Sequence, residues 1–249
     1  MSHHEPPSSV RILHPPRAML TRLRPPARRY LLRRWDIRIH GAEHVPASGP
    51  VVLAANHIGV LDGPLLAVFA PRPVHALTKQ EMFHGRTGRF LHRAGQIPLD
   101  RFDVDPRAVR TALRVLRDGG VVGVFPEGTR GDGELHRFHH GAAYLALVSG
   151  APVVPVILIG SREPGGSIGS TPARGAQIDL VMGAPVDLGA RPWPRTPGMV
   201  REASMLLRRR LLETLVEARR TTGRELPGPL PAGQDEDDPE TGLVDQGPR

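Results

Sequence analysis

The chain has 249 residues, no cysteine and a formal net charge of +8, with 32 arginines and a single lysine, Lys79. Its length suits one α/β domain with a sizeable core, and the lack of cysteine excludes disulfides, cysteine nucleophiles and cysteine-ligated zinc. Residues 230–249 carry six acids and one arginine, a net −5 that leaves +13 on the remainder. Excess arginine favours partners that bear phosphate, either lipid headgroups or nucleic acid.

The first 36 residues are predicted to be a disordered start followed by basic interfacial helices. They lack the apolar h-region of a secretory signal, and Pro25-Pro26 predicts two short helices within residues 17–35. Apolar and aromatic side chains among many arginines are typical of a helix lying on an anionic membrane surface. The alternative is an amphipathic helix packed on its own domain. We favour the membrane because residues 1–39 hold nine arginines against two acids.

From residue 37 to residue 222 the chain alternates apolar runs with helical patterns, which predicts an α/β fold with a largely parallel sheet flanked by helices. The expected strands are residues 37–40, 51–54, 74–77, 96–99, 121–125, 153–159 and 177–182. The expected helices are residues 65–70, 88–94, 106–118, 140–149 and 199–219. The Pro-, Gly- and acid-rich residues 223–249 are predicted to be a disordered tail.

One uncharged stretch allows a second interpretation. Residues 141–161 run 21 positions without a charge, which is long enough to span a membrane. Gly150, Pro152 and Pro155 interrupt it, however, and β-branched residues crowd only its second half. The composition therefore favours a buried helix followed by a buried strand.

A histidine and an aspartate follow the apolar run at residues 50–54. On one helix, His57 and Asp62 would point well apart, so the pair makes chemical sense on a bent connection, with the histidine after a strand and the aspartate opening a helix. There the carboxylate could hold one imidazole nitrogen and leave the other as a base. The alternative is that Asp62 simply caps the next helix and His57 is a structural histidine.

Two arginines also follow predicted strands. Arg101 comes after residues 96–99, and Arg130 comes after residues 121–125. Ligands of α/β sheets gather beyond the carboxyl ends of strands, and guanidinium groups bind phosphate in bidentate fashion. The turn at Glu127-Gly128 could add backbone N–H groups to an anion site.

In order and spacing, four blocks resemble the glycerolipid acyltransferase family typified by bacterial 1-acyl-sn-glycerol-3-phosphate acyltransferase. The blocks are Asn56-His57-x4-Asp62, Lys79-Gln80-Glu81 with Gly95-Gln96-Ile97-Pro98-Leu99-Asp100-Arg101, Phe125-Pro126-Glu127-Gly128-Thr129-Arg130, and Val154-Pro155-Val156-Ile157. Two departures are Pro98, where a phenylalanine is usual, and Phe138-His139-His140-Gly141, where the family often has Phe-Lys-x-Gly.

The resemblance implies acyl transfer from acyl-CoA or an acyl-carrier protein to the hydroxyl of a lysophospholipid, with His57 as the base and Asp62 orienting it. The expected acceptor is 1-acyl-sn-glycerol-3-phosphate, which would give phosphatidate, and the alternative acceptor is another lysolipid. It implies a peripheral protein on the cytoplasmic face of the membrane, with no metal and no cofactor. The substrate-binding residues that it implies are Asn56, Lys79, Arg101, Glu127, Gly128, Thr129, Arg130 and Pro155.

Other interpretations of the sequence are weaker. Gly165-Gly166-Ser167-Ile168-Gly169 fits the serine hydrolase pattern, but no helix is expected after it, so we predict a loop. His136, His139 and His140 lack carboxylates or cysteines at ligand spacing, so we expect solvated histidines. A nucleic-acid binder is disfavoured because few aromatics accompany the arginines. A non-catalytic lipid-binding protein on the same scaffold stays the alternative function.

Overall fold

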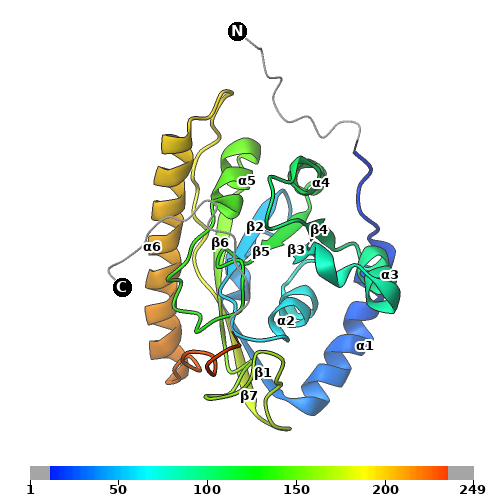
Figure 1. The fold of residues 1–249 in the computed structure, drawn as a ribbon, viewed down its shortest axis with the longest axis vertical. Coiled ribbons are helices and arrows are strands. Elements are labelled where there is room, and N and C mark those ends of the chain that lie inside the picture. Colours follow the sequence, from blue (N-terminus) through cyan, green and yellow to red (C-terminus); the bar gives the residue numbers. More distant parts are fainter. Residues whose placement is uncertain (1–11, 235–249) are drawn as a thin grey trace.

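A seven-stranded sheet forms the middle of the molecule (Figure 1). The computed structural model describes residues 12–234. The strands are β1 (Asp36–His40), β2 (Val51–Ala55), β3 (Val74–Lys79), β4 (Ile97–Leu99), β5 (Val121–Val124), β6 (Val153–Ile159) and β7 (Gln177–Met182). Their order is β1-β7-β6-β2-β5-β3-β4. Only the β6–β7 pair is antiparallel among these, so the predicted largely parallel sheet is confirmed.

Helices cover both faces of this sheet (Figure 1). They are α1 (Ala18–Arg34), α2 (Asp62–Phe69), α3 (Gly85–Arg93), α4 (Pro106–Arg117), α5 (Gly141–Ser149) and α6 (Pro197–Thr222), with short 3-10 turns at Ala42–His44 and Gln80–Met82. Successive side chains of strand β2 point to opposite faces of the sheet and pack against different helices. Val52 and Ala54 pack in the cluster that contains residues of α4, α5 and α6, whereas Leu53 packs in the cluster that contains residues of α1 and α2.

Local chemistry sets several of these boundaries. The side chain of Asp105 accepts hydrogen bonds from the backbone N–H groups of Arg107 and Ala108, which caps α4 ahead of Pro106 as predicted. Gly150 has a φ of +69° and ends α5, so the uncharged stretch is a buried helix and then the buried strand β6. Within residues 12–234, none of the helices is both long enough and apolar enough to cross a bilayer.

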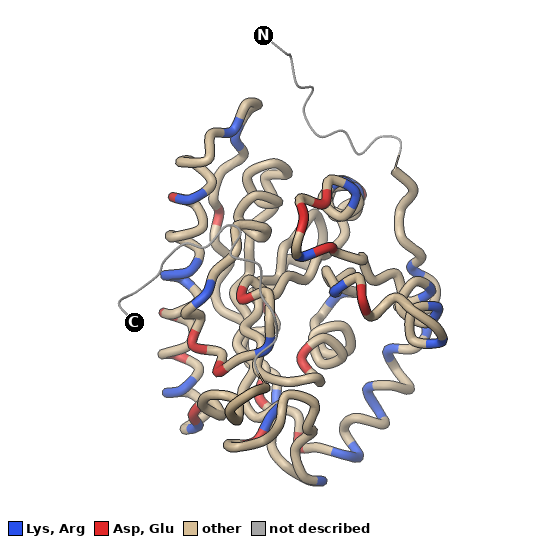
Figure 2. Tube along the Cα trace, viewed as in Figure 1, with Lys and Arg blue, Asp and Glu red and all other residues tan. Residues whose placement is uncertain are grey.

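The N-terminal helix differs from the prediction of two helices. Helix α1 runs unbroken through Pro25 and Pro26. Leu20, Leu31 and the following Trp35 are buried, which fixes the helix on the domain. Its other face is exposed and basic, and Figure 2 shows Lys or Arg positions along its whole length.

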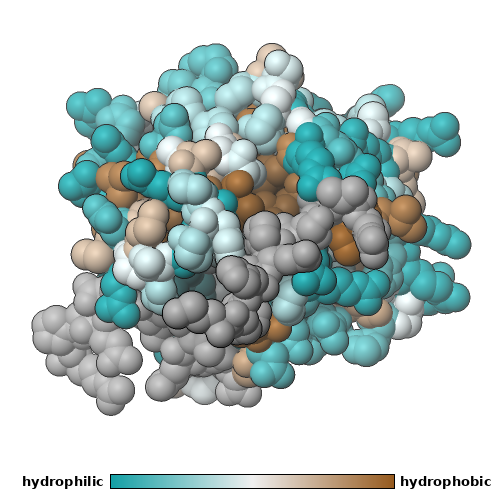
Figure 3. Space-filling model, turned by 90° about the horizontal axis from the view of Figure 1, so that it is seen from above, coloured by the Kyte–Doolittle hydropathy of each residue, from teal (hydrophilic) through white to brown (hydrophobic). Residues whose placement is uncertain are grey.

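Seen from above, apolar side chains gather near the middle of the molecule and hydrophilic ones surround them (Figure 3).

Parts of the two ends that are predicted to be disordered contact the domain within the described residues, and the disorder itself stays a prediction. Ile12 accepts a hydrogen bond from Arg114 through its carbonyl oxygen, and the ring of His14 lies against that of His75. At the other end, Leu226 is buried against the domain. Residues 1–11 and 235–249, which complete the two predicted disordered segments, lie outside the described residues.

Candidate active site

Five strands end at the same edge of the sheet because β2, β3, β4, β5 and β6 run parallel. His57 follows β2 by two residues, Lys79 is the last residue of β3, and Arg101 follows β4 by two residues. The loop at residues 125–130 follows β5. The predicted gathering of these segments beyond the carboxyl ends of the strands is therefore confirmed.

His57 and Asp62 form the predicted pair. The Nδ1 atom of His57 lies 2.8 Å from Oδ2 of Asp62, which is the first residue of α2 and fully buried. A carboxylate only accepts, so Nδ1 carries the proton and Nε2 is left with its lone pair. The ring stacks on Phe125 with centroids 4.3 Å apart and keeps 21% of its side chain exposed. Leu61, rather than Asp62, occupies the N-cap position of α2.

The same carboxylate organises the loop that carries the histidine. Oδ2 of Asp62 accepts hydrogen bonds from the backbone N–H groups of Ile58 at 2.6 Å and Gly59 at 2.8 Å. Oδ1 accepts a hydrogen bond from the hydroxyl of Ser161, which follows β6. Four donors thus fix both oxygens and, through them, the orientation of the imidazole.

Two predicted substrate-binding residues contact the backbone of this region. The buried Asn56 side chain donates to the carbonyl of Leu158 and accepts from its N–H, which ties the end of β2 to β6. Oε1 of Glu127 accepts a hydrogen bond from the N–H of His57 at 2.7 Å. Burial raises the pKa of the Glu127 carboxyl well above its ordinary value, the charges of Asp132 and Asp62 add to the rise, and the His57 N–H opposes it. Their predicted substrate contacts stay predictions.

The predicted phosphate-binding residues lie on the neighbouring loops. Arg101 donates to the carbonyl of Gly128 at 3.1 Å and pairs with Glu81 at 3.6 Å, so the second block touches the third. Gly128 has a φ of +75°, which favours glycine in this turn, and Thr129 beside it is half-buried. Arg130 donates to the carbonyl of Ile168 at 3.0 Å. Their contact with phosphate stays a prediction.

The remaining candidates have neighbours other than His57 and Asp62. Pro155 is buried within β6 opposite Ala54, and its predicted place in the acyl-donor region stays a prediction. His140 is hydrogen-bonded to Ser204, and His136 lies 3.4 Å from Asp132. Within the described residues, no group of three His, Asp or Glu side chains is arranged to hold a metal ion.

The structure adds contacts that the sequence analysis missed. Ser161 and Arg162 directly follow Gly160 at the end of the fully buried strand β6, and both join the His57 loop. The sequence signal that could have indicated these contacts is the polar pair Ser161-Arg162 so soon after an apolar strand. The predicted loop around Ser167 is confirmed, since residues 161–175 carry no helix or strand.

The comparisons with known proteins agree with this geometry. A family model described as Acyltransferase matches residues 36–159, which hold the His57–Asp62 pair and all four blocks. Fold and site therefore define an acyltransferase domain. The 1-acyl-sn-glycerol-3-phosphate acyltransferase of Bacillus subtilis (strain 168) is 30% identical over 155 residues, covering 61% of this chain and 75% of that protein. The chain belongs to the family of 1-acyl-sn-glycerol-3-phosphate acyltransferases.

Two further matches extend the comparison. The 1-acyl-sn-glycerol-3-phosphate acyltransferase alpha of Homo sapiens is 33% identical over 128 residues, which covers 49% of this chain and 45% of the human protein. The crystal structure of the 1-acyl-sn-glycerophosphate acyltransferase PlsC from Thermotoga maritima superposes with a TM-score of 0.57 and 24% identity, over 80% of each chain. This structural likeness supports the fold.

Proposed function

We propose that the protein transfers an acyl group from a thioester donor, acyl-CoA or acyl-carrier protein, to the free hydroxyl of 1-acyl-sn-glycerol-3-phosphate and so forms phosphatidate. One observation carries the proposal: Nδ1 of His57 is held by the buried Asp62 while the ring keeps an exposed edge. The Bacillus subtilis and human relatives are 1-acyl-sn-glycerol-3-phosphate acyltransferases, which supports this choice of acceptor.

The chemistry follows from the hydrogen bonds of His57. As the acceptor hydroxyl attacks the thioester carbon, its proton passes to Nε2, and Asp62 stabilises the imidazolium that forms. The C–S bond then breaks, and the thiolate leaves as the thiol after taking that proton. The cations of the neighbouring loops, Arg101 and Arg130, are proposed to bind the acceptor's phosphate.

The test compares wild type with His57→Ala, with acyl-CoA consumption measured in the presence of lysophosphatidic acid. Loss of general-base catalysis lowers the rate by about 10²–10⁴-fold, or about 3–5 kcal/mol of barrier. His44→Ala is a matched control, because His44 binds the carbonyl of Met182 in β7, which lies two strands away from β2 in the sheet. This variant is expected to keep the wild-type rate. Equal turnover by wild type and His57→Ala would favour a non-catalytic lipid-binding protein.

We further propose that the exposed face of α1 lies on an anionic membrane surface, where the lysophospholipid acceptor resides. Arg22, Arg29 and Arg33 are exposed on this helix together with Tyr30 and Leu32. Arginines with an aromatic and an aliphatic side chain suit the boundary between anionic headgroups and acyl chains. This arrangement would make the protein a peripheral one, predicted on the cytoplasmic face.

A further inference from the structure

A buried arginine joins four separate segments of the chain behind the His57–Asp62 pair. Arg162 is 1% exposed, and its guanidinium donates to four carbonyl oxygens. Nε reaches Ile58 at 2.8 Å, Nη1 reaches Gly166 at 3.1 Å, and Nη2 reaches Gly131 at 2.9 Å and Gly228 at 2.7 Å. These carbonyls belong to the His57 loop, the loop after β6, the loop after β5 and the segment after α6.

Both backbone polar groups of Ile58 are thereby hydrogen-bonded to side chains. Its N–H donates to Asp62 and its carbonyl accepts from Arg162, while Ser161, the neighbour of Arg162, donates to the other oxygen of Asp62. The approach is close, since a Cβ at Gly59 would come within 2.8 Å of the carbonyl oxygen of Ser161. Movement of Arg162 would therefore shift the donors that fix Asp62, and with them the imidazole.

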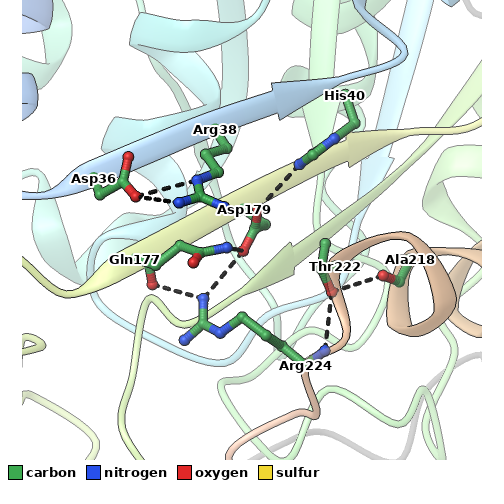
Figure 4. Close-up of polar contacts among 8 residues, drawn as sticks. All are labelled: Asp36, Arg38, His40, Gln177, Asp179, Ala218, Thr222 and Arg224. Atoms are coloured by element: carbon green, nitrogen blue, oxygen red, sulfur yellow. Dashed lines mark hydrogen bonds and ion pairs between the residues drawn. The ribbon is translucent and has the colours of Figure 1, made fainter.

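The chain after α6 is attached to the domain at three places, one of which is Arg162. We call residues 224–234 the C-terminal segment. Arg224 binds the carbonyl of Gln177 and the carboxylate of Asp179, which also pairs with His40 (Figure 4). Further along, Leu226 is buried in the same cluster as Ile58, and Gly228 accepts from Arg162.

The far end of the segment contacts the loop that holds Arg130. Oε1 of Gln234 accepts from the N–H of Ile168 at 2.9 Å, and the carbonyl of Ile168 accepts from Arg130 at 3.0 Å. One residue, Ile168, therefore separates the C-terminal segment from an arginine expected to bind phosphate.

We propose that Arg162 is a positioning residue for the His57–Asp62 pair, and that the C-terminal segment is a working part of the site, placing Arg162 through Gly228 and Arg130 through Ile168. The proposal rests on the proposed function for its kinetic readouts. Neither residue touches the reacting atoms: Arg162 acts through the His57 loop and is expected to affect kcat, whereas Gln234 acts through Arg130 and is expected to affect acceptor binding.

The first test is Arg162→Lys in the full chain. A lysine ammonium cannot reproduce the planar fork that serves four carbonyls, so the His57 loop should shift. We expect kcat to fall by about 10²-fold while KM for donor and acceptor stays within about threefold. Arg174→Lys, at an exposed position of the same loop, is the matched control and is expected to keep wild-type kcat.

A spectroscopic readout separates this proposal from the proposed function. The Nδ1–H proton of His57, assigned by its loss in His57→Gln, reports the bond to Asp62 by NMR without any turnover. We expect this resonance to shift or broaden in Arg162→Lys and to stay unchanged in Arg174→Lys. A folded Arg162→Lys protein with wild-type kcat and an unmoved resonance would overturn the role of Arg162.

The second test is Gln234→Ala, which removes one side-chain acceptor at the molecular surface and leaves Arg162 in place. Loss of one hydrogen bond to Ile168 should raise KM for the phosphate-bearing acceptor roughly 3- to 10-fold, with kcat and donor KM unchanged. Thr171→Ala, exposed on the same loop, is the control. Unchanged acceptor KM in Gln234→Ala would overturn the placement of Arg130 by the C-terminal segment, even if Arg162→Lys failed to fold.

Discussion

A single carboxylate, that of Asp62, holds both the imidazole and the loop on which the imidazole is carried. Its Oδ2 atom binds Nδ1 of His57 and the N–H groups of the next two residues, and its Oδ1 atom binds Ser161. Rotation of the ring breaks its bond to Oδ2, whereas movement of the loop would break several hydrogen bonds together. This coupling explains why the pair can be preorganised although it lies on a connection without regular structure.

At Glu127 burial disfavours the charged form of the side chain. Burial raises the pKa of its carboxyl, and its observed contact is with the N–H of His57. We expect Glu127→Gln to keep kcat within about threefold, because an amide oxygen accepts the same bond without a buried charge. Glu127→Ala leaves that N–H without its partner and should lose about 1–3 kcal/mol of unfolding free energy together with activity.

The pH dependence of stability checks the same argument. A carboxyl whose pKa is higher in the folded state contributes stability at pH values below its unfolded pKa, and this contribution is lost as pH rises toward the folded pKa. Thermal unfolding from pH 4.5 to 8.5 should therefore show Glu127→Gln gaining on wild type as pH rises. If Glu127→Gln were as inactive as Glu127→Ala, a negative charge at Glu127 would be required.

At the scale of elements, α1 shows how packing overrides a local signal. Two prolines inside a helix remove N–H donors and normally break it. In α1, Pro25, Pro26 and the preceding Thr21 and Arg22 are exposed, so carbonyl groups freed by the prolines can face water. Buried Leu20 on one side and Leu31 on the other attach both halves to the domain. The helix thus continues through a sequence that predicts a break.

The proposed membrane surface of α1 leads to a binding prediction. The variant replaces three exposed arginines of α1 by glutamine, at Arg22, Arg29 and Arg33. Each basic residue near an anionic bilayer contributes about 1 kcal/mol, so the triple variant should bind vesicles of phosphatidylserine about 10²-fold more weakly in flotation.

The control for that prediction removes the same charge elsewhere. Arg107, Arg110 and Arg117 are exposed on α4, and their triple glutamine variant should float like wild type. Equal losses in the two variants would mean that net charge, and no particular surface, decides binding. Vesicles of phosphatidylcholine alone should bind wild type weakly, since the attraction is electrostatic.

At the scale of the whole molecule, the features that could be predicted are those that depend on residues close together in the sequence. Strands β6 and β7 have the bounds predicted from their apolar runs, and the Asp105 cap follows from its proline and helical pattern. The gathering of His57, Arg101 and Arg130 followed from the rule that carboxyl ends of parallel strands share an edge. These signals are local or depend only on strand order.

Contacts between distant segments left no comparable signal. Arg162 binds carbonyls of residues 58, 131, 166 and 228, and a backbone carbonyl has no sequence preference that reveals such a partner. The Pro- and Gly-rich composition of residues 223–234 likewise gives no sign of these contacts and predicts disorder. Its few anchoring side chains, Arg224, Leu226 and Gln234, are recognised only once the sheet edge and the loop after β6 are in place.

The stability of the whole protein should also depend on a histidine remote from the site. His75 in β3 is 2% exposed, and its Nδ1 atom is hydrogen-bonded to the carbonyl of Gly95. Burial lowers its pKa from 6.5 to about 4, against the opposing effect of that hydrogen bond. The unfolded chain therefore takes up a proton between pH 6.5 and about 4, whereas the folded chain does not.

Because the unfolded state binds more protons in that window, the free energy of unfolding falls with falling pH. For a shift from 6.5 to about 4 the loss from His75 amounts to about 3 kcal/mol by pH 4. Urea unfolding at pH 7, 6, 5 and 4 measures it, with His75→Gln as the comparison, since glutamine can still donate to Gly95 but does not titrate. Other acidic and histidine groups contribute equally to both proteins, so the variant should lose about 3 kcal/mol less than wild type across this range, and parallel curves would contradict the assignment.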